Sequence, residues 1–309
     1  MAEMKATRDS FANFIVEYGK DHKNVVVMTA DVAASTLTKK FADAYPDRFI
    51  NVGIAEQNMM GMANGIAHCG KTVFVSAFAM FATGRAYEII RNSIVYTHGN
   101  VKICSPHAGL MVGEDGVTHQ CIEDIALMNV IPGMTVVYPA DDVATRKLLA
   151  QVAEMDGPCY VRLGRAATPV VYKESQKFTL GKALKLREGK DATIIATGSM
   201  VATALDAADK LEKQGINVRV LDMHTIKPID KKAILAAAKE TGAIVTAEEH
   251  SIYGGLGSIV SEIISENAPC KVKMVAIRDT FGETGKPADL LVKYGLTAKD
   301  IVKAVKSCL

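Results

Sequence analysis

The stretch over residues 105–120, SPHAGLMVGEDGVTHQ, brings several titratable side chains close together in the chain. His107 and His119 flank the acidic pair Glu114 and Asp115, with glycines between them. The stretch follows an apolar run typical of a buried strand, and open α/β sheets bind ligands where strands end. Glycines also let the backbone approach a ligand closely. A solvated loop is the alternative, since these residue types are ordinary in loops, but the pattern favours a ligand site.

Glu56 lies in the motif NVGIAEQN, at the start of a predicted helix whose early residues are small or apolar. An acidic residue at this position often only offsets the helix dipole. A partly buried carboxyl group could instead hydrogen-bond a heterocyclic nitrogen, with its protonation set by burial. The residues alone leave both interpretations open.

Phe74, Phe78 and Phe81 cluster in a chain that has only 9 phenylalanines. Core packing is the usual role of such a cluster, but one ring could form a stacking platform for a flat cofactor. Arg85 follows Phe81 by one helical turn and could hold a phosphate near that platform.

Three further arginines, Arg8, Arg162 and Arg165, are candidate anion ligands. The last two lie at or just past a predicted strand end, where arginine can grip phosphate with two hydrogen bonds. Solvated surface arginines are the alternative for each. Ser35 either caps a helix, the commoner role, or binds substrate.

The segment GGLGS at residues 254–258 resembles a phosphate loop but matches neither standard nucleotide-binding motif. It predicts a tight turn from a strand to a helix. His250 lies beside Glu248 and Glu249, and its role is open from the sequence.

Composition limits the class of protein. The 309 residues are 49% hydrophobic and 23% charged, with a net charge of +2, which gives no sign of nucleic-acid binding. The 6 cysteines are scattered without zinc-site spacing. With no signal core or membrane-spanning run, we expect a soluble, cytoplasmic protein without nucleic-acid or membrane partners.

Alternating strands and helices predict an α/β fold of two doubly wound domains with mainly parallel sheets. We expect a first domain over residues 1–165, a polar, lysine-rich linker over 166–190 and a second domain over 191–309. Strands are predicted at residues 25–29, 72–76, 101–104, 135–138, 159–162, 192–197, 217–221, 243–247 and 273–277. Helices are predicted at 7–18 (stopped by Gly19), 55–68, 84–96, 122–128, 142–154, 200–214, 231–239, 256–265 and 301–306. The last follows a capping box of Thr297 and Asp300.

Several motifs together resemble one family. GIAEQN, the phenylalanines before Arg-Ala-Tyr, and GEDGVTHQ followed by IPGMTVVYPAD resemble the pyrimidine-binding domain of transketolases. Deoxyxylulose-phosphate synthase is similar over the same segments. VRVLDMHTIKPID and EEHSIYGGLGS resemble the carboxyl-terminal domain of the same enzymes. The resemblance covers almost the whole chain and implies thiamine diphosphate as cofactor.

One motif of the family is missing from this sequence. Full-length relatives carry a GDG motif, followed by paired asparagines, that holds the metal and the diphosphate; Glu114-Asp115-Gly116 does not match it. The chain therefore resembles the carboxyl-terminal subunit of a split transketolase. The resemblance implies a separate amino-terminal subunit, which holds a divalent metal such as Mg, and no metal ligands within this chain. It also implies self-association of this chain as a homodimer and a two-plus-two heterotetramer with the partner.

The resemblance also implies roles for residues that bind the cofactor. Glu56 would be catalytic, hydrogen-bonding the aminopyrimidine ring and promoting its imino tautomer. Phe81 would stack on that ring with Phe78 nearby, and Asp31 in TADVAAS matches an acidic position beside the thiazolium. The cofactor supplies the carbanion chemistry, and the protein orients it.

Roles at the substrate follow from the same motifs. Asp115 would bind a substrate hydroxyl, and His107 would be catalytic and bind sugar oxygens or phosphate; His119, in the matching THQ, is a further substrate-binding residue. Phosphate-binding positions match Arg8, Ser35 and Arg165, whereas Arg85 matches the synthase better than transketolase. Val117 replaces the proline common in the family, which leaves the loop backbone less restricted.

The expected activity is reversible transfer of a two-carbon ketol unit between sugar phosphates in the pentose phosphate pathway. Xylulose 5-phosphate would be the donor and ribose 5-phosphate or a similar aldose the acceptor, with activity only in the presence of the partner subunit. The alternatives are a deoxyxylulose-phosphate synthase-like subunit, a 2-oxo-acid dehydrogenase beta-type subunit, and a non-catalytic partner protein.

Overall fold

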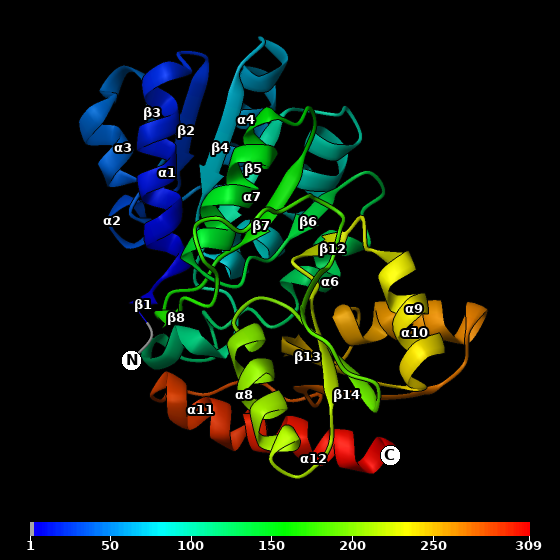
Figure 1. Cartoon of the computed structure of the whole chain (residues 1–309). Coiled ribbons are helices and arrows are strands. Elements are labelled where there is room, and N and C mark those ends of the chain that lie inside the picture. Colours follow the sequence, from blue (N-terminus) through cyan, green and yellow to red (C-terminus); the bar gives the residue numbers. More distant parts are fainter. Residues whose placement is uncertain (1–2) are drawn as a thin grey trace.

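The computed structural model describes residues 3–309 and has two mainly parallel sheets with helices on both faces (Figure 1). The predicted α/β class with mainly parallel sheets is confirmed. Every predicted strand is present, because β-branched runs such as VVVMT and TVFVS suit strands that are buried on both faces.

The first sheet is built mostly from the first half of the chain. Its neighbours pair in parallel except at one edge, where β12 runs antiparallel to β6. In spatial order, the strands found within residues 3–309 are β12 (Thr225–Lys227), β6 (Thr135–Val137), β7 (Cys159–Arg162), β5 (Val101–Ser105), β4 (Thr72–Ser76), β2 (Val25–Thr29) and β3 (Phe49–Asn51).

Helices cover both faces of this sheet. On one face α1 (Thr7–Asp21) packs beside α7 (Asp142–Glu154), and their apolar side chains share one buried cluster. On the other face α4 (Glu56–His68) and α6 (Asp124–Asn129) contribute to a second cluster. The short helices are α2 (Ala33–Thr36), α3 (Lys39–Ala44) and α5 (Tyr87–Ile89).

The second sheet has the same layered construction. Helices α8 (Met200–Glu212) and α12 (Ala298–Cys308) lie on one face, and α9 (Lys231–Thr241) and α10 (Leu256–Asn267) lie on the other. The capping box predicted before the last helix is confirmed, and a helix that was not predicted, α11 (Pro287–Lys293), precedes it. Its strands in spatial order are β14 (Lys271–Ile277), β13 (Ala243–Ser251), β10 (Ala192–Ala196), β11 (Val218–Asp222) and β9 (Leu184–Arg187).

Two sequence predictions fail at glycines. Gly19 does not end the first helix, because α1 continues to Asp21; a Cβ on Gly19 would lie 2.7 Å from Phe41, so the glycine serves close helix packing instead. The helix predicted to begin at Gly84 begins earlier, with π-helical turns over Met80–Arg85 and Ile90–Val95 on either side of α5. Such π turns occur frequently at functional sites.

The segment expected to be a linker, residues 166–190, contains two strands. β8 (Thr168–Pro169) pairs with β1 (Met4–Lys5), and β9 adds an antiparallel edge to the second sheet. Tyr172 and Phe178 are buried in the core. Each of the two main apolar clusters also contains residues from both halves of the chain, so the two sheets pack as one body.

Candidate active site

The predicted site residues follow the carboxyl ends of neighbouring strands. Asp31 follows β2, Phe78 follows β4, His107 follows β5 and Arg165 follows β7. Parallel strands end at the same edge of a sheet, so these residues gather where open α/β sheets bind ligands. Glu56 joins them as the first residue of α4, which follows β3.

Aromatic rings line part of this edge. The ring of Phe78 lies 4.1 Å from that of His107 and 5.9 Å from that of His119, measured between centroids. Phe81 meets His119 edge-on at 5.2 Å. Phe74 takes no part, because its side chain is fully buried in the core beneath α1.

Glu56 is buried, with only 4% of its surface exposed, which is more burial than an exposed dipole-compensating residue would show. Arg85 donates a hydrogen bond from Nη1 to Oε2 of Glu56 at 3.0 Å. The Arg85 guanidinium carbon also lies 4.9 Å from the centre of the Phe81 ring, a cation–π contact. Arg85, predicted to bind an anion, thus contacts the two groups predicted to bind the cofactor ring.

Asp31 has a left-handed backbone, with φ of 60°. Asn51 holds it there: the Asp31 N–H donates to Asn51 Oδ1 at 2.9 Å, and Asn51 Nδ2 donates to Asp31 Oδ1 at 3.2 Å. Such strain on a residue other than glycine concentrates at functional sites. Sequence reasoning missed Asn51, although it is the first residue of the same NVGIAEQN motif.

His107 is also strained and deeply buried, with φ of 62° and 2% of its surface exposed. Burial, reinforced by the positive charges of Arg8 and Arg165, lowers the pKa of His107 to about 3, so the ring is neutral near pH 7. Within residues 3–309 its Nδ1 has no hydrogen-bond partner. A buried polar atom without a partner is costly, and a bound ligand would supply one.

Arg8 and Arg165 form a cationic group beside His107. Arg8 donates from Nη1 to the backbone carbonyl of Ser35 at 3.2 Å, and its buried Nε has no partner among residues 3–309. Burial lowers the pKa of Arg8, opposed by the negative charges of Asp9 and Asp115 and reinforced by Arg165. Two partly buried guanidinium groups that repel each other favour an anionic ligand. Ser35 contributes its carbonyl oxygen to this contact rather than its hydroxyl.

Arg162 is excluded as an anion ligand. Its side chain is fully buried, and Nε donates to Asp124 Oδ2 at 2.8 Å in an internal ion pair. Arg165, three residues further along, is the arginine at the sheet edge, where Nη1 contacts Glu114 at 3.2 Å.

The GGLGS segment is the predicted strand-to-helix turn, and the protein itself fills it. Glu248 accepts hydrogen bonds from the backbone N–H groups of Leu256 and Gly257, both at 2.8 Å, at the start of α10. This carboxylate occupies the position a phosphate would need. His250 is buried nearby and bonds through Nδ1 to the Ser251 carbonyl.

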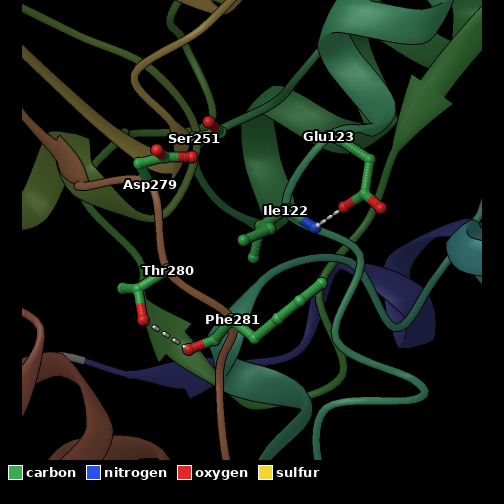
Figure 2. Close-up of a pocket in the computed structure, with 6 residues that line it drawn as sticks. All are labelled: Ile122, Glu123, Ser251, Asp279, Thr280 and Phe281. Atoms are coloured by element: carbon green, nitrogen blue, oxygen red, sulfur yellow. Dashed lines mark hydrogen bonds between the residues drawn. The ribbon is translucent and has the colours of Figure 1, made fainter.

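Two adjoining pockets lie where the second half of the chain meets the site. One, of about 210 Å³, is lined by Ile122, Glu123, Ser251, Asp279, Thr280 and Phe281 (Figure 2). Figure 2 shows Phe281 extending toward the segment that carries Ile122. The other, of about 380 Å³, shares Ile122, Glu123 and Phe281 and is also lined by Phe81 and Arg85. No motif or spacing in the sequence pointed to Phe281.

Within residues 3–309, no three or more histidine, cysteine or acidic side chains converge as a metal site would require. In the same range no helix has the length and apolar character needed to cross a membrane.

Two family models match the chain. The family model for the transketolase pyrimidine-binding domain matches residues 3–170, and that for the transketolase C-terminal domain matches residues 181–301. The chain therefore belongs to the transketolase family.

Its relatives include subunits of similar length. A transketolase C-terminal section of Methanocaldococcus jannaschii is 46% identical over 97% of this chain and 95% of the relative. A 6-deoxy-6-sulfo-D-fructose transketolase subunit of a Clostridium species is 44% identical (96% and 92% covered), and a subunit of the apulose-4-phosphate transketolase of Phocaeicola vulgatus is 42% identical (97% and 96%). A split-gene transketolase solved as an inactive beta4 tetramer is 51% identical, with a TM-score of 0.92 over 98% of each chain.

The residues present fit the cofactor that these domains imply, thiamine diphosphate. A buried carboxyl group at Glu56 and the face of Phe81 suit a nitrogen heterocycle. These groups match the ring end of the molecule.

Proposed function

We propose that this chain is the carboxyl-terminal subunit of a two-chain, cytoplasmic transketolase that is active only with an amino-terminal subunit. In a two-plus-two heterotetramer the two kinds of subunit share thiamine diphosphate, and the partner holds the diphosphate and a divalent metal such as Mg. The buried Glu56 carboxyl, linked to the face of Phe81 through Arg85, carries the proposal, because no core-packing role requires that arrangement.

The proposed activity is transfer of a two-carbon ketol unit from xylulose 5-phosphate to ribose 5-phosphate or a similar aldose. When bound, thiamine diphosphate supplies the nucleophilic carbon for this transfer. Glu56 hydrogen-bonds its aminopyrimidine, Phe81 stacks on it and Asp31 lies beside the thiazolium. His107, which is neutral near pH 7, binds sugar oxygens together with Asp115. Arg8 and Arg165 hold the phosphate. Ser35 and His119 complete the substrate-binding residues.

A second candidate substrate is another ketose with an anionic end. Relatives at 44% and 42% identity are named for a sulfosugar and for apulose 4-phosphate. The Arg8–Arg165 group supports either, since paired guanidinium groups bind sulfonate and phosphate alike.

The test is to co-express the chain with an amino-terminal transketolase subunit and assay glyceraldehyde 3-phosphate release from xylulose 5-phosphate with ribose 5-phosphate. Parallel assays use 6-deoxy-6-sulfofructose and apulose 4-phosphate. The E56Q complex should assemble normally by size-exclusion chromatography yet lose about 10²–10⁴-fold in turnover. Absence of ketol transfer from every donor, with pyruvate decarboxylated instead, would overturn the proposal.

A further inference from the structure

The loop that carries His107 and Asp115 is held from the second half of the chain by Glu249. This residue lies on β13 with 1% of its surface exposed. Its Oε1 accepts a hydrogen bond from the backbone N–H of Met111 at 2.7 Å. Met111 lies between His107 and Asp115, so a side chain from the second sheet fixes the middle of the proposed substrate loop.

The carboxylate is itself held on its other side. Ser199 donates its hydroxyl to Oε2 of Glu249 at 2.7 Å, and the hydroxyl of Tyr138 donates to the same oxygen at 3.5 Å. Arg162 also donates from Nη2 to the backbone carbonyl of Glu249 at 3.0 Å. With both the side chain and the backbone restrained, Glu249 is a rigid anchor rather than a mobile surface group.

The loop backbone passes directly against this anchor. Gly109 has φ of +79°, and a Cβ added there would lie 2.3 Å from Oε1 of Glu249. Such close approach requires glycine. The glycine two residues after His107 thus has a specific role: it makes room for a carboxylate from the other sheet.

We propose that Glu249 is a positioning residue for the substrate loop, setting His107 and Asp115 for the ketose through its bond to Met111. The inference rests on the proposed function. A hydrogen bond to the ketose that is lost through misplacement of these side chains costs on the order of tenfold in affinity. Loss of the anchor therefore affects ketose use, whereas Glu56 and Phe81, on other elements, keep the cofactor.

The neighbouring Glu248 provides a matched control. Both are buried glutamates of β13, but Glu248 caps α10 and does not contact the loop. In the assembled complex, E249A should raise the KM for xylulose 5-phosphate about tenfold, with unchanged affinity for thiamine diphosphate. E248A should lower thermal stability without that KM change. E249Q, whose amide can accept from Met111 and donate to Ser199, should restore KM to near the wild-type value.

Hydrogen exchange of the full chain provides a readout that does not depend on activity. E249A should speed exchange in peptides covering residues 109–116, and E248A should do so in peptides covering residues 255–258. Equal KM in E249A and wild type, or equal KM increases in E249A and E248A, would overturn the inference. If E249A does not fold, S199A replaces it as the test variant. Unchanged KM and unchanged hydrogen exchange of the loop in S199A would overturn the inference. A wild-type complex without ketol transfer would overturn the proposed function instead, and exchange at residues 109–116 would then show whether the anchor exists.

Discussion

At the scale of single residues, Arg85 holds both groups that a cofactor ring would use. Its guanidinium is bonded to Glu56 and lies over Phe81. A ring that stacks on the same face of Phe81 and bonds the same oxygen of Glu56 would displace Arg85. The contact therefore competes with the cofactor.

We expect R85A to increase the affinity of the assembled complex for thiamine diphosphate several-fold, because the competing ion pair is lost. The Arg85 end of this ion pair is half exposed, so the pair is worth on the order of 1 kcal/mol. Titration calorimetry measures the effect. R91A removes the same charge from an exposed arginine on the following helical turn. It should leave the affinity for thiamine diphosphate unchanged. Weaker binding by R85A than by R91A would show that Arg85 holds the cofactor instead.

His107 makes the stability of the chain sensitive to acid. Its pKa is about 3 in the folded chain, against roughly 6.5 when unfolded, so only the unfolded chain gains the proton between these values. The contribution of His107 to the free energy of unfolding is therefore fully present above about pH 6.5 and declines as the pH falls toward about 3. The melting temperature of H107Q should therefore fall less than that of wild type between about pH 7 and 5. The melting temperature of H68Q, which replaces an exposed histidine, should fall as much as that of wild type. Parallel curves of melting temperature against pH for H107Q and wild type would contradict the prediction.

The candidate residues Glu56, Asp31, Phe81 and His107 could be named from the sequence because they stand in local motifs, and their roles at the site stay predictions. Burial could not be predicted in the same way. Arg162 and Arg165 have the same residue type and nearly the same position, yet one forms an internal ion pair with Asp124 and the other lies at the sheet edge. Only the contacts of the folded chain distinguish them.

At the scale of elements, two helical glycines should respond in opposite ways to the same substitution. A Cβ on Gly19 of α1 would lie 2.7 Å from Phe41, whereas one on Gly61 of α4 meets nothing within 4 Å. We expect G19A to destabilise the chain by about 1–3 kcal/mol through overpacking. G61A should stabilise it by about 0.5–1 kcal/mol, since alanine favours a helix. Chemical denaturation of the isolated chain measures both, and a stabilised G19A would refute the close packing.

Strands and long helices could be predicted because their apolar spacing is a local property of the sequence. The exceptions depend on distant partners. β12 is three residues long and forms only against β6, nearly ninety positions earlier, and the π-helical turns around α5 have no distinctive spacing. The contact of Glu249 could not be predicted for the same reason, since its partner Met111 lies in the other half of the chain.

At the scale of the whole molecule, the proposed active site is divided between two kinds of chain. We expect the isolated chain to bind thiamine diphosphate at least 100-fold more weakly than the assembled complex, a difference of about 2.7 kcal/mol, because the diphosphate and metal contacts come from the partner. Calorimetry in the presence of Mg measures this. Equally tight binding by the isolated chain would mean that its own residues suffice.

The placement of β12 has a consequence for anyone dividing this chain. Lys227 of that strand also donates to the carbonyl groups of Asn129 and Ile131, so the second half closes an edge of the first sheet. A fragment ending near residue 180 would leave β6 with unpaired backbone groups, a template for aggregation. The two family domains are therefore poor candidates for separate expression or for exchange between relatives, unless the β12 segment stays with the first.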